Sequence, residues 1–132
     1  MARKEKEITI EEGRDAGKTF KITEMGAVQA NKWIIRALGV FGKSGTDFNY
    51  IRSMDMQSLL QEFVKTNYAE TEPLLDELLS CVSFVKDGVS VSMKGNMIDS
   101  VIEDWGTIFR LQLESLMLNI GFLEQGGEST SE

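Results

Sequence analysis

Apolar residues at helical spacing recur in four segments, and this periodicity limits the fold more than any other feature of the sequence. The four segments span Ala27 to Phe41, Met54 to Thr66, Pro73 to Val82, and Met97 to Phe122. Ser53 is placed to cap the second helix, and Pro73 suits the first turn of the third. Gly106 lies inside the last segment, where it predicts a close packing contact or a bend.

Two stretches before the first helix alternate between apolar and polar residues, which is the pattern of half-buried strands. Ile8 and Ile10 alternate in this way, as do Phe20 and Ile22, and a glycine-containing loop joins them as a β-hairpin. A second short hairpin or an extended loop is expected near 82–93, where valines alternate with serines; the alternative is a third helix that continues to Val85. The predicted fold class is mainly α (α+β): a small four-helix domain with an N-terminal β-hairpin.

The loop of the first hairpin contains the motif GRDAGKT, which invites comparison with a nucleotide-binding P-loop. The P-loop reads G-x-x-x-x-G-K-[ST], whereas only three residues separate Gly13 from Gly17. A strand pattern follows Lys18, in place of the helix that would direct backbone N–H groups at phosphates. The motif is therefore interpreted as a hairpin loop with Gly13 and Gly17 at positive φ.

Length and composition predict one domain in a reducing compartment. A chain of 132 residues can bury a core of its own. We expect a frayed start at 1–7, a single helical domain at 8–124, and a disordered tail or linker at 125–132. The single cysteine, Cys81, lies in an apolar run and is interpreted as a buried thiol of a cytoplasmic protein. Neither a secretory signal nor an apolar run of about 18 residues, as a membrane span needs, is visible.

Catalytic chemistry has little support in the sequence. The chain has no histidine, which removes the usual base of hydrolytic triads and a common zinc ligand. Acidic clusters at 70–77 and 99–104 lack the spacing of a metal-binding loop, and they are interpreted as solvated helix faces. We therefore predict no catalytic, cofactor-binding or metal-binding residues, and a non-enzymatic function.

Charge is divided unevenly along the chain. Residues 1–66 carry eleven Lys or Arg and nine Asp or Glu, whereas residues 67–132 carry three and twelve, giving net charges of +2 and −9. The overall charge of −7 argues against nucleic acid as a partner. Such polarity suits head-to-tail self-association or docking of a basic partner, and it equally suits a solvated acidic surface that aids solubility.

Aromatic residues supply the candidate contact sites. Most of the seven methionines and both tryptophans are expected in the core. Four amphipathic helices nevertheless leave apolar surface that a partner helix or a second copy could cover. We predict that Trp33 and Phe41 in the first helix, and Trp105 and Phe109 in the last, are shared between the core and contacts with a partner or oligomer.

The stretch GKTFKITEMGAVQANKWIIRAL, from Gly17 to Leu38, resembles the N-terminal signature of tail assembly chaperones from long-tailed bacteriophages and prophages. The shared positions form a short strand followed by a helix with A-x-x-W and R-A-L, and they are Gly17, Lys18, Phe20, Ile22, Glu24, Met25, Ala30, Trp33, Arg36, Ala37 and Leu38. The closing stretch DSVIEDWGTIFRLQLESLMLNIGFLEQ is similar to the last helix of that family. Residues 45–95 resemble it only in composition, and Gly26 and Gly106 depart from its pattern.

The resemblance implies a non-enzymatic chaperone of phage tail assembly. Such a protein binds the tape measure protein, helps to recruit the major tail protein, and acts in the host cytoplasm without entering the mature virion. Self-association into a homo-oligomer is also expected, as is a longer product made by ribosomal frameshifting near Gly126 to Glu128. Two alternatives remain open: a small structural tail or connector protein of the virion, and a cytoplasmic protein-interaction domain.

Overall fold

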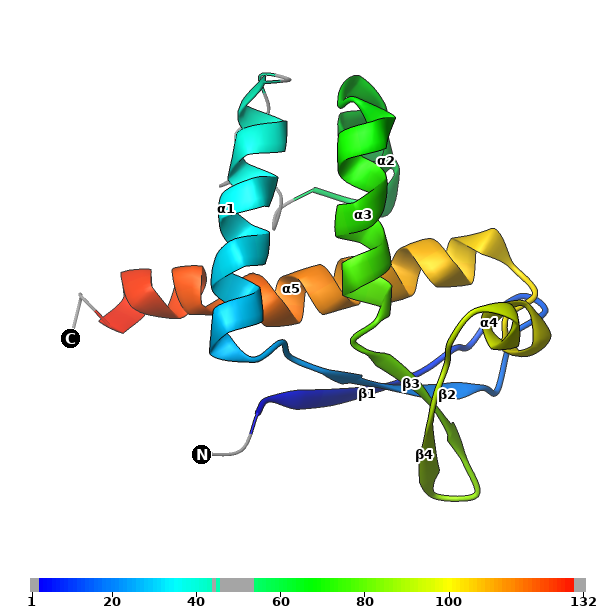
Figure 1. Cartoon of the computed structure of the whole chain (residues 1–132). Helices are drawn as coiled ribbons and strands as arrows, with labels where there is room; N and C mark the ends of the chain where they lie inside the picture. The colour runs from blue at the N-terminus through cyan, green and yellow to red at the C-terminus, as the bar shows by residue number, and fades with distance from the viewer. Residues whose placement is uncertain (1–2, 44, 46–53, 130–132) are drawn as a thin grey trace. The chain divides into compact units, whose positions relative to one another are not determined.

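A computed structural model describes residues 3–43, 45 and 54–129, with side chains described as far as residue 120. Its elements, shown in Figure 1, are β1 (Glu5–Thr9), β2 (Thr19–Thr23), α1 (Ala27–Lys43), α2 (Met56–Lys65), α3 (Tyr68–Leu79), β3 (Val82–Lys86), β4 (Val89–Ser92), α4 (Asn96–Val101) and α5 (Trp105–Ser129). The fold class is α+β, as predicted. The chain forms two compact units: a sheet unit of Met1–Met25 with Leu78–Glu132, and a helical unit of Gly26–Glu77.

The sheet unit contains the predicted N-terminal hairpin and, near 82–93, a hairpin rather than the alternative of an extended loop. The two hairpins form one antiparallel sheet of order β1-β2-β3-β4. The joining ladder pairs β2 with β3 and sets Ile22 opposite Val82. Because these two strands are far apart in sequence, local patterns could not predict this pairing. β1 begins at Glu5, which pairs with Thr23, so the expected fraying of residues 1–7 does not extend this far along the chain.

One face of the sheet forms the core of this unit. The buried core residues are Ile8, Ile10, Phe20, Ile22, Val82, Met93, Ile102 and Leu111. Polar residues of α5 are buried as well, including Ser115 and Asn119. The Asn119 side chain accepts a hydrogen bond from the Met25 N–H at 2.8 Å, and its amide donates to the Ser115 carbonyl at 2.8 Å. Cys81, expected to be buried, is half-buried beside this amide.

The last helix predicted over Met97–Phe122 is wrong as a single element, because the chain forms α4 and α5 with an extended Ile102 between them. Ile102 is buried, so the break places an apolar side chain in the sheet core. Gly106 is therefore the second residue of a helix, where neither a bend nor a close contact is needed. At the other end, α5 continues to Ser129, into the tail expected at 125–132, although Gly126 and Gly127 are poor helix formers. Residues 130–132 lie outside the described chain.

The helical unit differs from expectation at two helix starts. Asp55 caps α2 by accepting a hydrogen bond from the Ser58 N–H at 2.7 Å; the predicted cap, Ser53, lies outside the described residues. Pro73 is inside α3 rather than in its first turn, because Asn67 starts the helix earlier. The Asn67 side chain accepts from the Ala69 N–H at 3.0 Å. α3 also ends at Leu79, so Val82 belongs to a strand.

Candidate helix-docking groove

α1 has apolar residues on two faces, one buried and one exposed. Trp33, Ile34, Ala37 and Phe41 are buried. Val28, Ile35 and Leu38 are 71%, 62% and 47% exposed. Exposed aliphatic residues that recur along one helix are a typical feature of an interaction surface. The sequence indicated an amphipathic helix but did not distinguish this second apolar face from the buried one.

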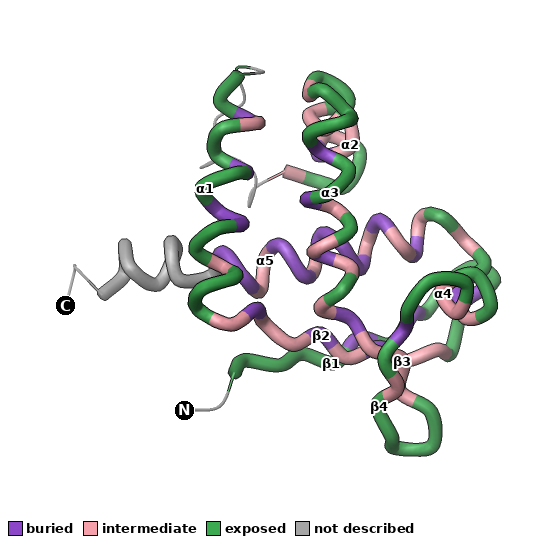
Figure 2. Tube along the Cα trace, viewed as in Figure 1, coloured by how far each residue is buried: buried purple, intermediate pink, exposed green. Residues whose placement is uncertain are grey.

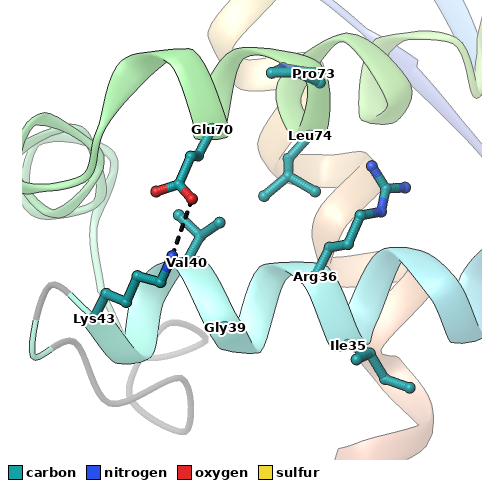
Figure 3. Close-up of a pocket in the computed structure, with 8 residues that line it drawn as sticks. All are labelled: Ile35, Arg36, Gly39, Val40, Lys43, Glu70, Pro73 and Leu74. Carbon is teal, nitrogen blue, oxygen red and sulfur yellow. Dashed lines mark hydrogen bonds and ion pairs between the residues drawn. The ribbon is translucent and has the colours of Figure 1, made fainter.

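A groove of about 360 Å³ lies between α1 and α3 within the helical unit, shown in Figure 3. Its lining residues are Ile35, Arg36, Gly39, Val40, Lys43, Glu70, Pro73 and Leu74. The side chains of Val40 and Leu74 are directed toward each other across it (Figure 3). Ile35 belongs both to the groove and to the exposed face of α1, so the two apolar surfaces are continuous.

Ion pairs between α1 and α3 border the groove. Arg36 Nη2 lies 2.5 Å from Glu77 Oε1, and Lys43 Nζ lies 3.1 Å from Glu70 Oε2, the contact drawn in Figure 3. These side chains are partly exposed, so each pair adds little to the free energy of unfolding. Their effect is to set charged groups of both signs beside an apolar strip, an arrangement that can orient a docked helix.

Gly39 gives the groove an open position. Among the described residues, a Cβ built at Gly39 would meet no atom within 4 Å, so no packing contact with them requires a glycine there. Glycine in a helix interior nevertheless costs about 1 kcal/mol relative to alanine. The missing side chain leaves space in which another backbone could approach α1 closely.

Trp33 and Phe41, two of the four predicted contact residues, lie in the core of the helical unit. Trp33 is 1% exposed, and its Nε1 donates a hydrogen bond to the Leu74 carbonyl at 3.1 Å. Phe41 is 2% exposed and packs edge-on against Phe63 with ring centroids 5.3 Å apart. Trp33 therefore holds a lining residue of the groove in place and presents little surface of its own.

The other two predicted residues belong to the sheet unit. Trp105, the first residue of α5, is 70% exposed, whereas Phe109 is buried. Of the four, Trp105 alone has a largely exposed side chain. The structure thus places Trp33 and Phe41 in one unit, Trp105 and Phe109 in the other.

The GRDAGKT loop forms a polar centre that the sequence did not predict. The Asp15 carboxylate is fully buried and accepts hydrogen bonds from the Glu103 N–H at 2.9 Å, the Asp104 N–H at 3.0 Å and the Thr107 hydroxyl at 2.7 Å. Lys18 Nζ donates to Asp15 at 2.8 Å and to the Val101 carbonyl at 2.6 Å. We call this set of contacts the Asp15 clasp.

The loop has the geometry of a hairpin and differs from that of a P-loop. Gly13 and Gly17 have φ values of 82° and 90°, as predicted for the hairpin, and β2 follows Lys18 directly. Burial opposes ionisation of Asp15, but the hydrogen bonds from Lys18, the two N–H groups and Thr107 together hold its pKa well below the ordinary value. The Lys18 ammonium group is engaged within the clasp by Asp15 and the Val101 carbonyl.

Comparison with family models, curated proteins and solved structures gives no match. Within the described ranges, no helix is long and apolar enough to cross a membrane. Those same ranges hold no group of three or more His, Cys, Asp or Glu side chains arranged to bind a metal ion.

Proposed function

We propose that this chain is a non-enzymatic tail assembly chaperone that binds a helical segment of the tape measure protein. The observation that carries the proposal is the groove between α1 and α3, continuous with the exposed face of α1. Binding of an amphipathic helix in an apolar groove needs anchor pockets and a close backbone approach, and Gly39 offers the second. The resemblance of Gly17–Leu38 to tail assembly chaperones supports the choice of partner, since this stretch includes most of α1.

The proposed chaperone acts in the host cytoplasm and leaves before the virion is complete. In that role it holds the apolar faces of the tape measure protein apart until the major tail protein assembles around it. The nearest alternative to the proposed chaperone is another non-enzymatic phage protein, a structural tail protein, which would be retained in purified particles. Detection of this chain in stoichiometric amounts in those particles would favour that alternative.

Gly39 provides the sharpest test of the groove. We expect Gly39→Ala to raise the free energy of unfolding by about 1 kcal/mol, because alanine is the better helix former. The added methyl group should nevertheless weaken binding of the tape measure protein at least about tenfold, since it occupies space needed by the partner backbone. Affinity is measured by calorimetry or co-purification with the partner's helical segments, and stability by urea unfolding.

Gly42→Ala is the matched control, because Gly42 is also in α1 and is not among the groove residues. In the part of the chain that the structure describes, no atom lies within 4 Å of a Cβ built at Gly42. This control should be at least as stable as the original chain and bind the tape measure protein with unchanged affinity. Equal binding by both variants would remove the groove from the proposal. Failure of the original chain to bind any segment of the tape measure protein would contradict the proposed function itself.

A further inference from the structure

The two edges of the sheet differ in how they are protected. The β1 edge is charged. Glu5 forms an ion pair with Lys21, with 3.1 Å between Oε2 and Nζ, and Lys6 forms one with Glu114, with 2.8 Å between Nζ and Oε1. Such charges on an edge strand discourage pairing with other chains. The β4 edge has the sequence Val-Ser-Val-Ser, is largely exposed (Figure 2), and has no further strand beside it in the described part of the molecule.

The turn before β4 determines which backbone groups face this open edge. Asp87 and Gly88 have φ values of 53° and 78°, as a two-residue type I′ turn requires, with Lys86 opposite Val89. In such a turn the Lys86 carbonyl accepts from the Val89 N–H, so Val89 faces β3. Since hydrogen-bonding direction alternates along a strand, the N–H and C=O groups of Ser90 and Ser92 face outward.

An apolar row crosses the core face of the sheet and ends at the same edge. Ile8 lies opposite Phe20, Phe20 opposite Phe84, and Phe84 opposite Val91. The Phe20 and Phe84 rings have centroids 5.6 Å apart. Val91 ends the row and is only half-buried, which leaves one side of it available to a neighbouring strand.

We propose that β4 is a self-association edge, on which a second copy of this chain adds its own β4 in antiparallel orientation. The outward N–H and C=O groups of Ser90 form hydrogen bonds with those of Ser92 of the second copy. A two-fold axis at Val91 makes the Ser92 groups bond to Ser90 of the second copy in the same way. The two Val91 side chains then lie opposite each other, and the apolar row continues into the second sheet. The result is one continuous sheet built from both copies.

Charge favours this occupant over an unrelated strand. Asp87 precedes β4 and Lys94 follows it, so antiparallel copies bring the Asp87 end of one beside the Lys94 end of the other. The strand between them is uncharged, whereas the chain as a whole carries −7 and repels its copies elsewhere. The inference follows from the sheet alone and does not depend on the proposed function.

A charge exchange at the two serines tests the pairing and its register together. Ser90→Lys/Ser92→Lys sets Lys opposite Lys in the proposed dimer, and Ser90→Glu/Ser92→Glu sets Glu opposite Glu. Both serines are exposed, so neither double variant disturbs the core. In sedimentation equilibrium the original chain should rise from 14.8 kDa toward about twice that mass with concentration. Each double variant alone should associate at least about tenfold more weakly, and an equimolar mixture should recover the association.

A backbone variant supplies an independent control. Ser90→Pro removes an outward N–H and should abolish the dimer without affecting the β3–β4 ladder. Glu7→Pro makes the matched change on the β1 edge. The Ile10 N–H donates to the Lys18 carbonyl, and because hydrogen-bonding direction alternates along the strand, the Glu7 N–H faces outward. This variant should still dimerise. A chain that remains at 14.8 kDa at millimolar concentration overturns the proposal. A dimer that is unaffected by the serine variants also overturns it. So would the finding that the β4 edge binds an unrelated extended peptide but not a second copy of this chain.

Discussion

At the scale of residues, Asp15 makes the contacts on which the start of α5 depends. Its carboxylate receives two backbone N–H groups, a hydroxyl and an ammonium group, all within the sheet unit. Sequence patterns gave no signal for it, because an aspartate in a hairpin loop ordinarily satisfies the turn itself. The conformations of Gly13 and Gly17 were predictable, since they depend only on the local turn, whereas the clasp depends on residues about ninety positions away.

Asp15→Asn should lower the free energy of unfolding by about 2–3 kcal/mol, because it removes a buried charge that several donors stabilise. The pKa of Asp15 is lower in the folded chain than in the unfolded one, so its contribution is complete above the unfolded pKa of about 4 and is lost as pH falls below it. The difference between the original chain and Asp15→Asn should therefore be constant from about pH 5 to 7 and shrink below about pH 4. Urea unfolding at a series of pH values measures this, and a difference independent of pH down to 2.5 would contradict it.

The two tryptophans should respond differently to truncation. Trp33→Ala creates a cavity and leaves the Leu74 carbonyl without the hydrogen bond from Trp33 Nε1. We therefore expect a loss of about 3–5 kcal/mol in the free energy of unfolding. Trp105→Ala removes an exposed side chain and should change stability by less than about 0.5 kcal/mol. Thermal and urea unfolding of both variants decide this. Reduced binding to the tape measure protein by a stable Trp105→Ala would support a contact role for that residue.

At the scale of elements, regular structure was most predictable where local signals agreed. Both hairpins and the three helices of the helical unit follow from periodicity and turn residues, with boundaries in error by a few residues. The separation of α4 from α5 could not be predicted, because Met97–Ile120 keeps helical spacing throughout. What interrupts it is tertiary: burial of Ile102 and capture of the next N–H groups by Asp15. The groove between α1 and α3 also could not be predicted from the sequence, since it depends on how α3 packs against α1.

Gly88→Ala tests the turn that orients β4. An alanine at a φ of 78° carries a backbone penalty of about 1–2 kcal/mol. No atom of the described residues lies within 4 Å of the added Cβ to cause a clash. We expect a loss of that size in the free energy of unfolding. Gly106→Ala is the control, because Gly106 has an equally open position without positive φ and should be neutral or stabilising. Equal stability of the two variants would show that the turn does not require glycine.

At the scale of the whole molecule, two compact units share one chain, and perturbations should be confined to the unit that contains them. The Asp15 clasp lies wholly in the sheet unit. In hydrogen–deuterium exchange, Asp15→Asn should therefore speed exchange in residues 103–112 and in the first hairpin, with little change in α1. Mass spectrometry of peptic peptides measures this. Equal acceleration in α1 would mean that the two units open in a single cooperative step.

The order of the strands has a consequence for the history of such chains. The helical unit occupies the connection between β2 and β3, and the chain leaves and rejoins the sheet at neighbouring points, since the Thr23 N–H donates to the Cys81 carbonyl at 3.0 Å. A connection whose ends already meet can be lengthened, shortened or exchanged without altering the ladder around it. Recombination that exchanges the helical segment between β2 and β3 would therefore change the binding partner and leave the sheet intact.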